Sequence, residues 1–146
     1  IFGVCFGHQL IAQALGGHVE KSIKGWGLGL HTYEINNKTE YMSNLSEEVT
    51  LNICHQDQVL KVPDEATIYA RSQFCENAGF YIKDKVLTMQ AHPEFLVDFI
   101  KALLNARRDV TIPKEFVDLA LVKLNSSPHA VQSKQFAETI RRFFLS

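Results

Sequence analysis

The apolar positions along the chain predict mainly strands in its first two thirds, with one helix near the start, and helices in its last third. Strands are expected where β-branched and aromatic residues cluster or alternate with polar ones. These stretches are residues 1–4, 29–35, 49–54, 66–70, 79–83 and 86–90. The last two stretches flank Asp84 and Lys85, so we expect them to form a hairpin with a two-residue connection.

Apolar residues three or four positions apart predict four helices. These cover residues 8–15, 96–108, 114–124 and 128–142. The first should end at Gly16 and Gly17, because glycine commonly terminates helices. The last is expected to begin with Ser127 as its N-cap and with Pro128 at its first helical position.

This order of elements, with one strand-turn-helix unit at the start, predicts a layered α/β fold. The chain has 146 residues, which is the size of one ordinary domain. Residues 1–4 form a strand with no earlier neighbours in this chain, so the sheet would be small for its helices. We therefore expect residues 1–146 to be the C-terminal part of a single domain whose N-terminal strands are missing.

Composition and charge narrow the classes of function. The apolar fraction of 46% supports a sizeable core, and the formal net charge of −1 comes without a dense basic stripe. We therefore expect neither nucleic acid nor a membrane surface as a partner. The three cysteines, Cys5, Cys54 and Cys75, are odd in number and widely spaced. They suggest free thiols in a reducing, cytoplasmic compartment, with no metal site and no cofactor.

Cys5 stands in the pattern Gly-x-nucleophile-x-Gly, formed by residues 3–7. This pattern is typical of a sharp strand-to-helix turn that holds a nucleophile in a strained backbone conformation. Glycine is expected at positions 3 and 7 because side chains there would collide with the neighbouring strand and helix. The sulfur would project at the helix N-terminus, where the thiolate is favoured. The backbone N–H of Phe6 would point to a developing oxyanion.

A nucleophilic cysteine needs a base that a third group orients. His92 and Glu94 flank Pro93 directly after the predicted strand 86–90. Strand ends in open α/β sheets are where ligands bind, so both side chains could reach the cleft above Cys5.

The stretch Gly3-Val4-Cys5-Phe6-Gly7-His8-Gln9, followed downstream by His92-Pro93-Glu94, resembles the class I (triad-type) glutamine amidotransferases. The resemblance is closer to the stand-alone members related to the glutaminase domain of GMP synthase. It covers nearly the whole chain and implies a three-layer, flavodoxin-like α/β fold. It also implies that upstream strands and a glycine-bearing loop are missing here.

The resemblance implies roles for three residues as a triad. Cys5 would attack the side-chain amide of glutamine and form a γ-glutamyl thioester. His92 would act as general acid and base, first releasing ammonia and then activating water. Glu94 would orient His92.

Further roles follow from the same resemblance. Phe6 would contribute an oxyanion N–H, and Gln9 would contact the glutamine substrate. Gln56 and Asp57 lie where family members recognise the α-amino and α-carboxylate groups. For His8 and His55, which also adjoin these motifs, we expect structural or substrate-loop roles rather than a second catalytic base.

Three functions stay open on the sequence alone. The first is hydrolysis of the glutamine side-chain amide, with ammonia passed to a synthetase domain or partner. The second keeps the thioester but cleaves or transfers γ-glutamyl groups of peptides, because both reactions pass through the same acyl-enzyme. The third is a non-catalytic relative that keeps the turn around Cys5 only as a feature of the fold. This fragment alone is expected to be nearly inactive.

Overall fold

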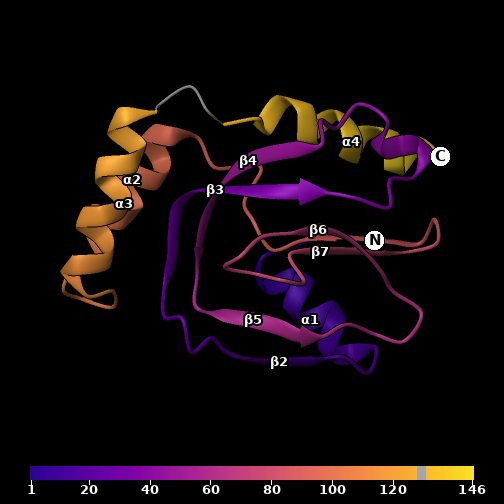
Figure 1. Cartoon of the computed structure of the whole chain (residues 1–146), viewed down its shortest axis with the longest axis horizontal. Coiled ribbons are helices and arrows are strands. Elements are labelled where there is room, and N and C mark those ends of the chain that lie inside the picture. Colours follow the sequence, from indigo (N-terminus) through magenta and orange to yellow (C-terminus); the bar gives the residue numbers. More distant parts are fainter. Residues whose placement is uncertain (128–130) are drawn as a thin grey trace.

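The protein is represented by a computed structural model that describes residues 1–127 and 131–146. A curled six-stranded sheet forms its centre, with helices against both faces (Figure 1). In the order in which they pair, its strands are β1 (Phe2–Val4), β8 (Val86–Met89), β7 (Gly79–Ile82), β6 (Thr67–Arg71), β3 (Gly27–Ile35) and β4 (Glu48–His55). The α/β class predicted from the sequence is confirmed.

The remaining elements surround this sheet. They are α1 (Phe6–Ala14), α2 (Val97–Arg107), α3 (Lys114–Ser126), α4 (Ser133–Leu145), the short 3-10 helix η1 (Glu40–Met42), and an antiparallel ribbon of β2 (His18–Lys21) and β5 (Asp57–Lys61). Figure 1 shows α4 beside β4 and β3, and the α2–α3 pair at one end of the molecule. Within the described residues, none of the helices combines the length and apolar character needed to cross a bilayer.

The pairing of β1 with β8 positions the start of α1. The two strands run parallel, with Phe2 opposite Leu87 and Val4 opposite Met89. The backbone N–H of Cys5 extends this pairing by donating to the carbonyl of Met89 at 2.8 Å. Because parallel strands end at the same edge of a sheet, the residues that follow them, Cys5 and Gln90, become neighbours.

Three apolar clusters attach the helices to the sheet. Phe136 of α4 packs with Leu87 on one face, in the largest cluster. Ala12 of α1 packs with Phe80 on the other face, in a cluster that also takes in the β2–β5 ribbon. Helices α2 and α3 close over Leu28 at the beginning of β3. The residues that follow β1 and β8, among them Cys5 and His92, line a cleft whose wall also includes Leu103 and Arg107 of α2.

The β2–β5 ribbon and η1 were not predicted from the sequence. Strand β2 is mostly exposed, and in both strands of the ribbon only Val19 and Val59 pack against the apolar cluster under α1. Such short, polar strands carry too few apolar positions to reveal a period of two. Their pairing is a tertiary feature, because β2 and β5 lie far apart in the sequence.

Several predicted boundaries were wrong. The last helix begins at Ser133, and Ser127 instead follows α3, its N–H donating to the carbonyl of Lys123 at 3.1 Å. Pro128 lies outside the described residues. Helix α1 begins at Phe6 because the turn at Cys5 is tighter than expected. The β7–β8 connection has three residues, because Lys83 turns the chain with a φ of 47°.

The two glycines that flank Cys5 have different surroundings. A Cβ at Gly3 would lie 2.6 Å from Ile11 Cδ1 and 2.9 Å from the backbone of Gly7. Strand β1 and helix α1 can therefore approach only because position 3 has no side chain. At Gly7 a Cβ would meet no described atom within 4 Å. The expected collision is confirmed for Gly3 and is wrong for Gly7 in the described part of the chain.

This difference predicts opposite outcomes for two matched variants. Gly3→Ala should lower the free energy of unfolding by about 1–3 kcal/mol, because the added methyl overpacks the β1–α1 contact. Gly7→Ala should leave stability unchanged or raise it by up to about 1 kcal/mol, because alanine is the better helix former. Denaturant unfolding of both variants measures the difference, and equal destabilisation by the two would contradict the packing described here.

Candidate active site

Cys5 sits at the turn between β1 and α1 in a conformation that non-glycine residues rarely adopt. Its φ is 49° and its ψ is −102°. A residue held in such a region costs on the order of 1–3 kcal/mol and persists only where its surroundings fix it. The pairing of β1 with β8 and the absence of a side chain at Gly3 supply that constraint. The strained turn predicted around Cys5 is therefore present.

His92 follows β8 and is held from several sides. Its Nδ1 lies 2.6 Å from Glu94 Oε1, and its ring stacks on Phe95 with centroids 3.8 Å apart and planes 7° apart. Its backbone N–H donates to the carbonyl of Asn52 at 2.8 Å, while the Asn52 amide donates to the carbonyl of Phe95 at 2.9 Å. The imidazole is therefore oriented, with Nε2 as the ring nitrogen left for Cys5.

The charges at this position favour a protonated imidazole. Burial by itself lowers the pKa of His92, but hydrogen bonds to the side chains of Cys5 and Glu94 outweigh it and raise that pKa to about 9. Burial likewise acts to raise the pKa of Glu94, and its bond to His92 overcomes this and lowers it. Near neutral pH, Glu94 is a carboxylate beside an imidazolium, which is the arrangement that a proton donor next to Cys5 requires.

The residues expected to contact substrate surround an open cleft of about 520 Å³. The cleft is lined by Cys5, Gln9, Lys21, Trp26, Cys54, His55, Gln56, Asp57, His92, Phe95, Leu103 and Arg107. Gln9, Gln56 and Asp57 are thus brought together with Cys5 and His92. The Phe6 side chain is 72% exposed, and its backbone N–H opens α1, where the first N–H groups have no acceptor within a helix.

Comparison with known proteins decides the family. The family described as "Glutamine amidotransferase class-I" matches residues 1–101. The chain belongs to the class-I glutamine amidotransferase family. It is 41% identical over 105 residues to gamma-glutamyl peptidase 4 of Arabidopsis thaliana, covering 68% of this chain and 42% of the relative. It is 36% identical over 95 residues to a glutamine-hydrolyzing GMP synthase subunit of Methanothermobacter thermautotrophicus, covering 64% of this chain and 50% of the relative.

A solved structure supports the fold of this family. A glutamine amidotransferase from Thermotoga maritima superposes with a TM-score of 0.82 at 23% identity, covering 99% of this chain and 62% of that one. The flavodoxin-like fold of the class I amidotransferases is therefore confirmed. The chain spans about half the length of the curated relatives it matches.

Several residues of this candidate site were not predicted from the sequence. Gln90 donates from Nε2 to Cys5 Sγ at 3.5 Å, and Asn52 and Phe95 hold the His92 loop. Gln90 is the last residue of the predicted strand 86–90, so its place at the strand end was the available signal. Lys21 and Arg107 reach the cleft from β2 and from the end of α2, and their approach depends on tertiary packing.

His8 and His55 have the structural surroundings that were expected. His8 is fully buried, its Nδ1 lies 2.9 Å from Thr88 Oγ1, and burial lowers its pKa to about 3. His55 Nδ1 lies 3.0 Å from the carbonyl of Asp57, and burial lowers its pKa to about 4. The rings of His8 and His55 are therefore neutral imidazoles near pH 7. Of these three histidines, only His92 is an imidazolium, with both ring nitrogens protonated.

Cys54 and Cys75 differ from Cys5 in their environment, although all three thiols are free. Burial raises the pKa of Cys54 and raises that of Cys75 to about 12. Neither thiol therefore forms thiolate readily near neutral pH. No group of His, Cys, Asp and Glu side chains suited to hold a metal ion occurs within residues 1–127 and 131–146.

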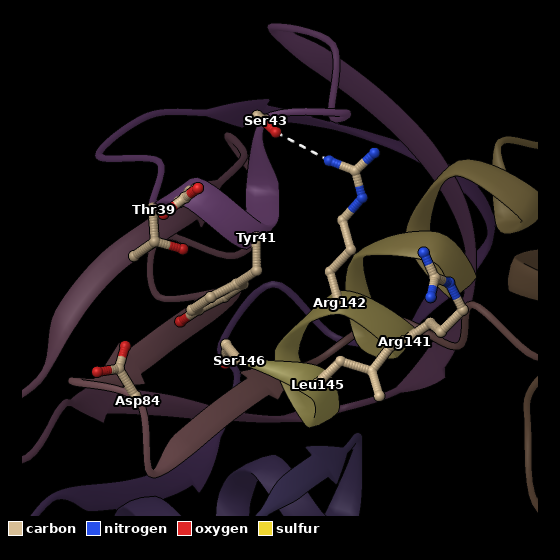
Figure 2. A pocket seen from close by; sticks show the side chains of 9 residues that line it. Thr39, Tyr41, Ser43, Asp84, Arg141, Arg142, Leu145 and Ser146 are labelled. Carbon is tan, nitrogen blue, oxygen red and sulfur yellow. Dashed lines mark hydrogen bonds between the residues drawn. The ribbon is translucent and has the colours of Figure 1, made fainter.

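A larger cavity of about 700 Å³ lies elsewhere, at the C-terminal end of α4 (Figure 2). Its two arginines, Arg141 and Arg142, are already paired with Glu138, and Arg142 also donates to Ser43 Oγ at 2.9 Å. Its lining includes neither a cysteine nor a histidine. The cleft beside Cys5 is therefore the candidate active site, although it is the smaller of the two.

The bond between His92 and Glu94 predicts a measurable pKa change. Glu94→Gln should move the pKa of His92 from about 9 toward the ordinary value of 6.5, because the carboxylate that stabilises the imidazolium is removed. NMR titration of the His92 ring measures the shift. Glu65→Gln, which changes an exposed carboxylate away from the cleft, is the control.

The raised pKa of His92 also determines how its contribution to the stability of the folded chain changes with pH. The pKa of His92 is higher in the folded chain than in the unfolded chain, so its contribution is fully present below pH 6.5 and is lost as pH rises through about 9. The stability difference between the wild-type chain and Glu94→Gln should therefore shrink across that window. An unchanged His92 titration in Glu94→Gln would refute the pairing.

Proposed function

We propose that this chain carries the nucleophile, base and orienting carboxylate of an enzyme that cleaves the side-chain amide bond of glutamine or of γ-glutamyl compounds. The observation that carries the proposal is the strained Cys5 at the start of α1, beside a His92 ring that is bonded to Glu94. A strained backbone at a cleft, next to an oriented imidazole, is the arrangement of an activated nucleophile.

The first half of the reaction forms a thioester. The Cys5 thiolate attacks the side-chain carbonyl carbon, and the resulting oxyanion accepts a hydrogen bond from the N–H of Phe6. The imidazolium of His92 donates its proton to the leaving nitrogen, and the C–N bond breaks. Ammonia leaves from glutamine, or an amine leaves from a γ-glutamyl peptide, and a γ-glutamyl thioester remains on Cys5.

The second half of the reaction uses the neutral imidazole that the first half leaves behind. His92 takes a proton from water, and the hydroxide equivalent attacks the thioester carbonyl. The C–S bond breaks, glutamate is released, and the thiolate and imidazolium are restored. Glu94 keeps the same ring orientation throughout, so one histidine serves both as acid and as base.

Substrate recognition would fall to other residues that line the same cleft. Gln56 and Asp57 would bind the α-amino and α-carboxylate groups, with the Asp57 carboxylate attracting the ammonium. Both N–H groups of the Gln9 amide are already used, toward the Asp57 carbonyl at 2.8 Å and toward Gln90 Oε1 at 3.1 Å. Gln9 would therefore offer the substrate its Oε1 as an acceptor.

A γ-glutamyl peptide is the second candidate substrate. Two relatives of this chain are gamma-glutamyl peptidases 3 and 4 of Arabidopsis thaliana, at 34% and 41% identity. A cleft of about 520 Å³ is within the range of sites for ligands larger than one amino acid. Lys21 and Arg107 on its wall would pair with the carboxylate of a peptide leaving group.

Two wider proposals follow from the relatives. Residues 1–146 would be the C-terminal part of a single amidotransferase domain, since the large apolar side chains of Phe6 and Leu10 are exposed on α1 where further structure would cover them. If glutamine is the substrate, a cytoplasmic synthetase partner would receive the ammonia, as the GMP synthase relatives suggest by name.

The test is to measure glutamate release by the full-length protein from glutamine and from a γ-glutamyl dipeptide. Cys5→Ala should abolish release from both, because no other thiol replaces the nucleophile, while Cys75→Ala should retain it. Release from the dipeptide alone would select the peptidase function, and release from glutamine alone would select the glutaminase function. Unchanged release in Cys5→Ala would disprove the proposal.

A further inference from the structure

Gln90 is a polar side chain with no exposed surface, next to the nucleophilic sulfur. Its backbone N–H donates to the carbonyl of Ala78 at 2.7 Å, which fixes the chain just beyond β8. A buried amide that lacks hydrogen-bond partners destabilises a protein, so the partners it has are informative. Gln90 has two of them, Gln9 and Cys5.

A chain of hydrogen bonds fixes which end of the Gln90 amide faces the sulfur. It starts at the backbone carbonyl of Asp57, which can only accept, so Gln9 must present Nε2 to it, at 2.8 Å. The second N–H of Gln9 Nε2 then meets Gln90 at 3.1 Å, where only Oε1 can accept it. Gln90 Nε2 is left facing Cys5 Sγ at 3.5 Å. The amide of Gln90 is thus a donor to the sulfur, and turning it over would break both bonds.

We propose that Gln90 is a positioning residue of this active site, whose amide N–H fixes the direction of the Cys5 sulfur and favours its thiolate form. The inference rests on the proposed role of Cys5 as nucleophile. A thiolate accepts a hydrogen bond more strongly than a thiol does, so a fixed donor stabilises the charged form. The parallel pairing of β1 with β8 fixes the backbone of Cys5, and Gln90 then fixes its side chain.

The same hydrogen bonds also connect Asp57, one of the proposed substrate-binding residues, to the proposed nucleophile Cys5. The Asp57 carbonyl belongs to the wall where the α-amino end of the substrate would bind, and Gln9 and Gln90 connect it to the sulfur. His92 approaches the same sulfur from the loop beyond β8. Gln90 is a neutral donor, so it supports the thiolate without competing with His92 for its proton.

The test follows the alkylation of Cys5 by iodoacetamide in the full-length protein, with peptide mapping by mass spectrometry. Gln90→Met keeps the length of the side chain and removes the donor, so alkylation at neutral pH should slow about tenfold, or about 1.4 kcal/mol. The ultraviolet absorbance of the thiolate should fall in parallel. Gln90→Glu still accepts from Gln9 but directs an oxygen to the sulfur, so alkylation should slow further.

Gln58→Met is the matched control, because Gln58 is also a buried glutamine but does not line the cleft beside Cys5. In Gln58→Met, the rate at which Cys5 is alkylated should stay at the wild-type value. A folded Gln90→Met or Gln90→Glu variant that reacts within twofold of wild type would overturn the inference. Alkylation needs no turnover, so it tests this inference separately from the proposed function. If the alkylation rate depends on Gln90 but the protein hydrolyses neither substrate, only the proposed function is contradicted.

Discussion

The parallel pairing of β1 with β8 is the constraint on which the rest of the site depends. Val4 lies opposite Met89, so the chain leaves the sheet at two adjacent points, through Cys5 on one side and through Gln90 on the other. The N–H of Cys5 remains bonded to the Met89 carbonyl while the chain turns sharply into α1. Sheet pairing thus holds the strained residue and brings Gln90 and the His92 loop to the same edge.

The electrostatics of the site depend on one protonated ring among neutral ones. His8 and His55 are buried with lowered pKa values, whereas His92 keeps its proton because Cys5 and Glu94 both stabilise it. The bond between His92 and Glu94 uses Nδ1, which leaves Nε2 free to serve the sulfur. Burial lowers the pKa of each ring, and only specific hydrogen bonds reverse that effect.

The predictable parts of this molecule were those in which adjacent residues determine the structure. The turn around Cys5 and the His92–Glu94 pair were visible in the sequence because each occupies a few consecutive positions. The β2–β5 ribbon and the Gln9–Gln90–Cys5 chain of hydrogen bonds were not, because each joins segments far apart in the sequence. Gly7 shows a different limit: a symmetrical motif suggested equal crowding at both glycines, and only Gly3 is crowded.

The proposed mechanism requires the sulfur of Cys5 to take up the γ-glutamyl group. The most direct measurement is to mix the full-length protein with a γ-glutamyl anilide, quench it with acid before turnover is complete, and map the covalent adduct by mass spectrometry. The proposed mechanism predicts a γ-glutamyl group on the Cys5 sulfur, and hydroxylamine should remove this group because it cleaves thioesters. An adduct on Cys54 or Cys75, or anilide cleavage by Cys5→Ala at the wild-type rate, would contradict it.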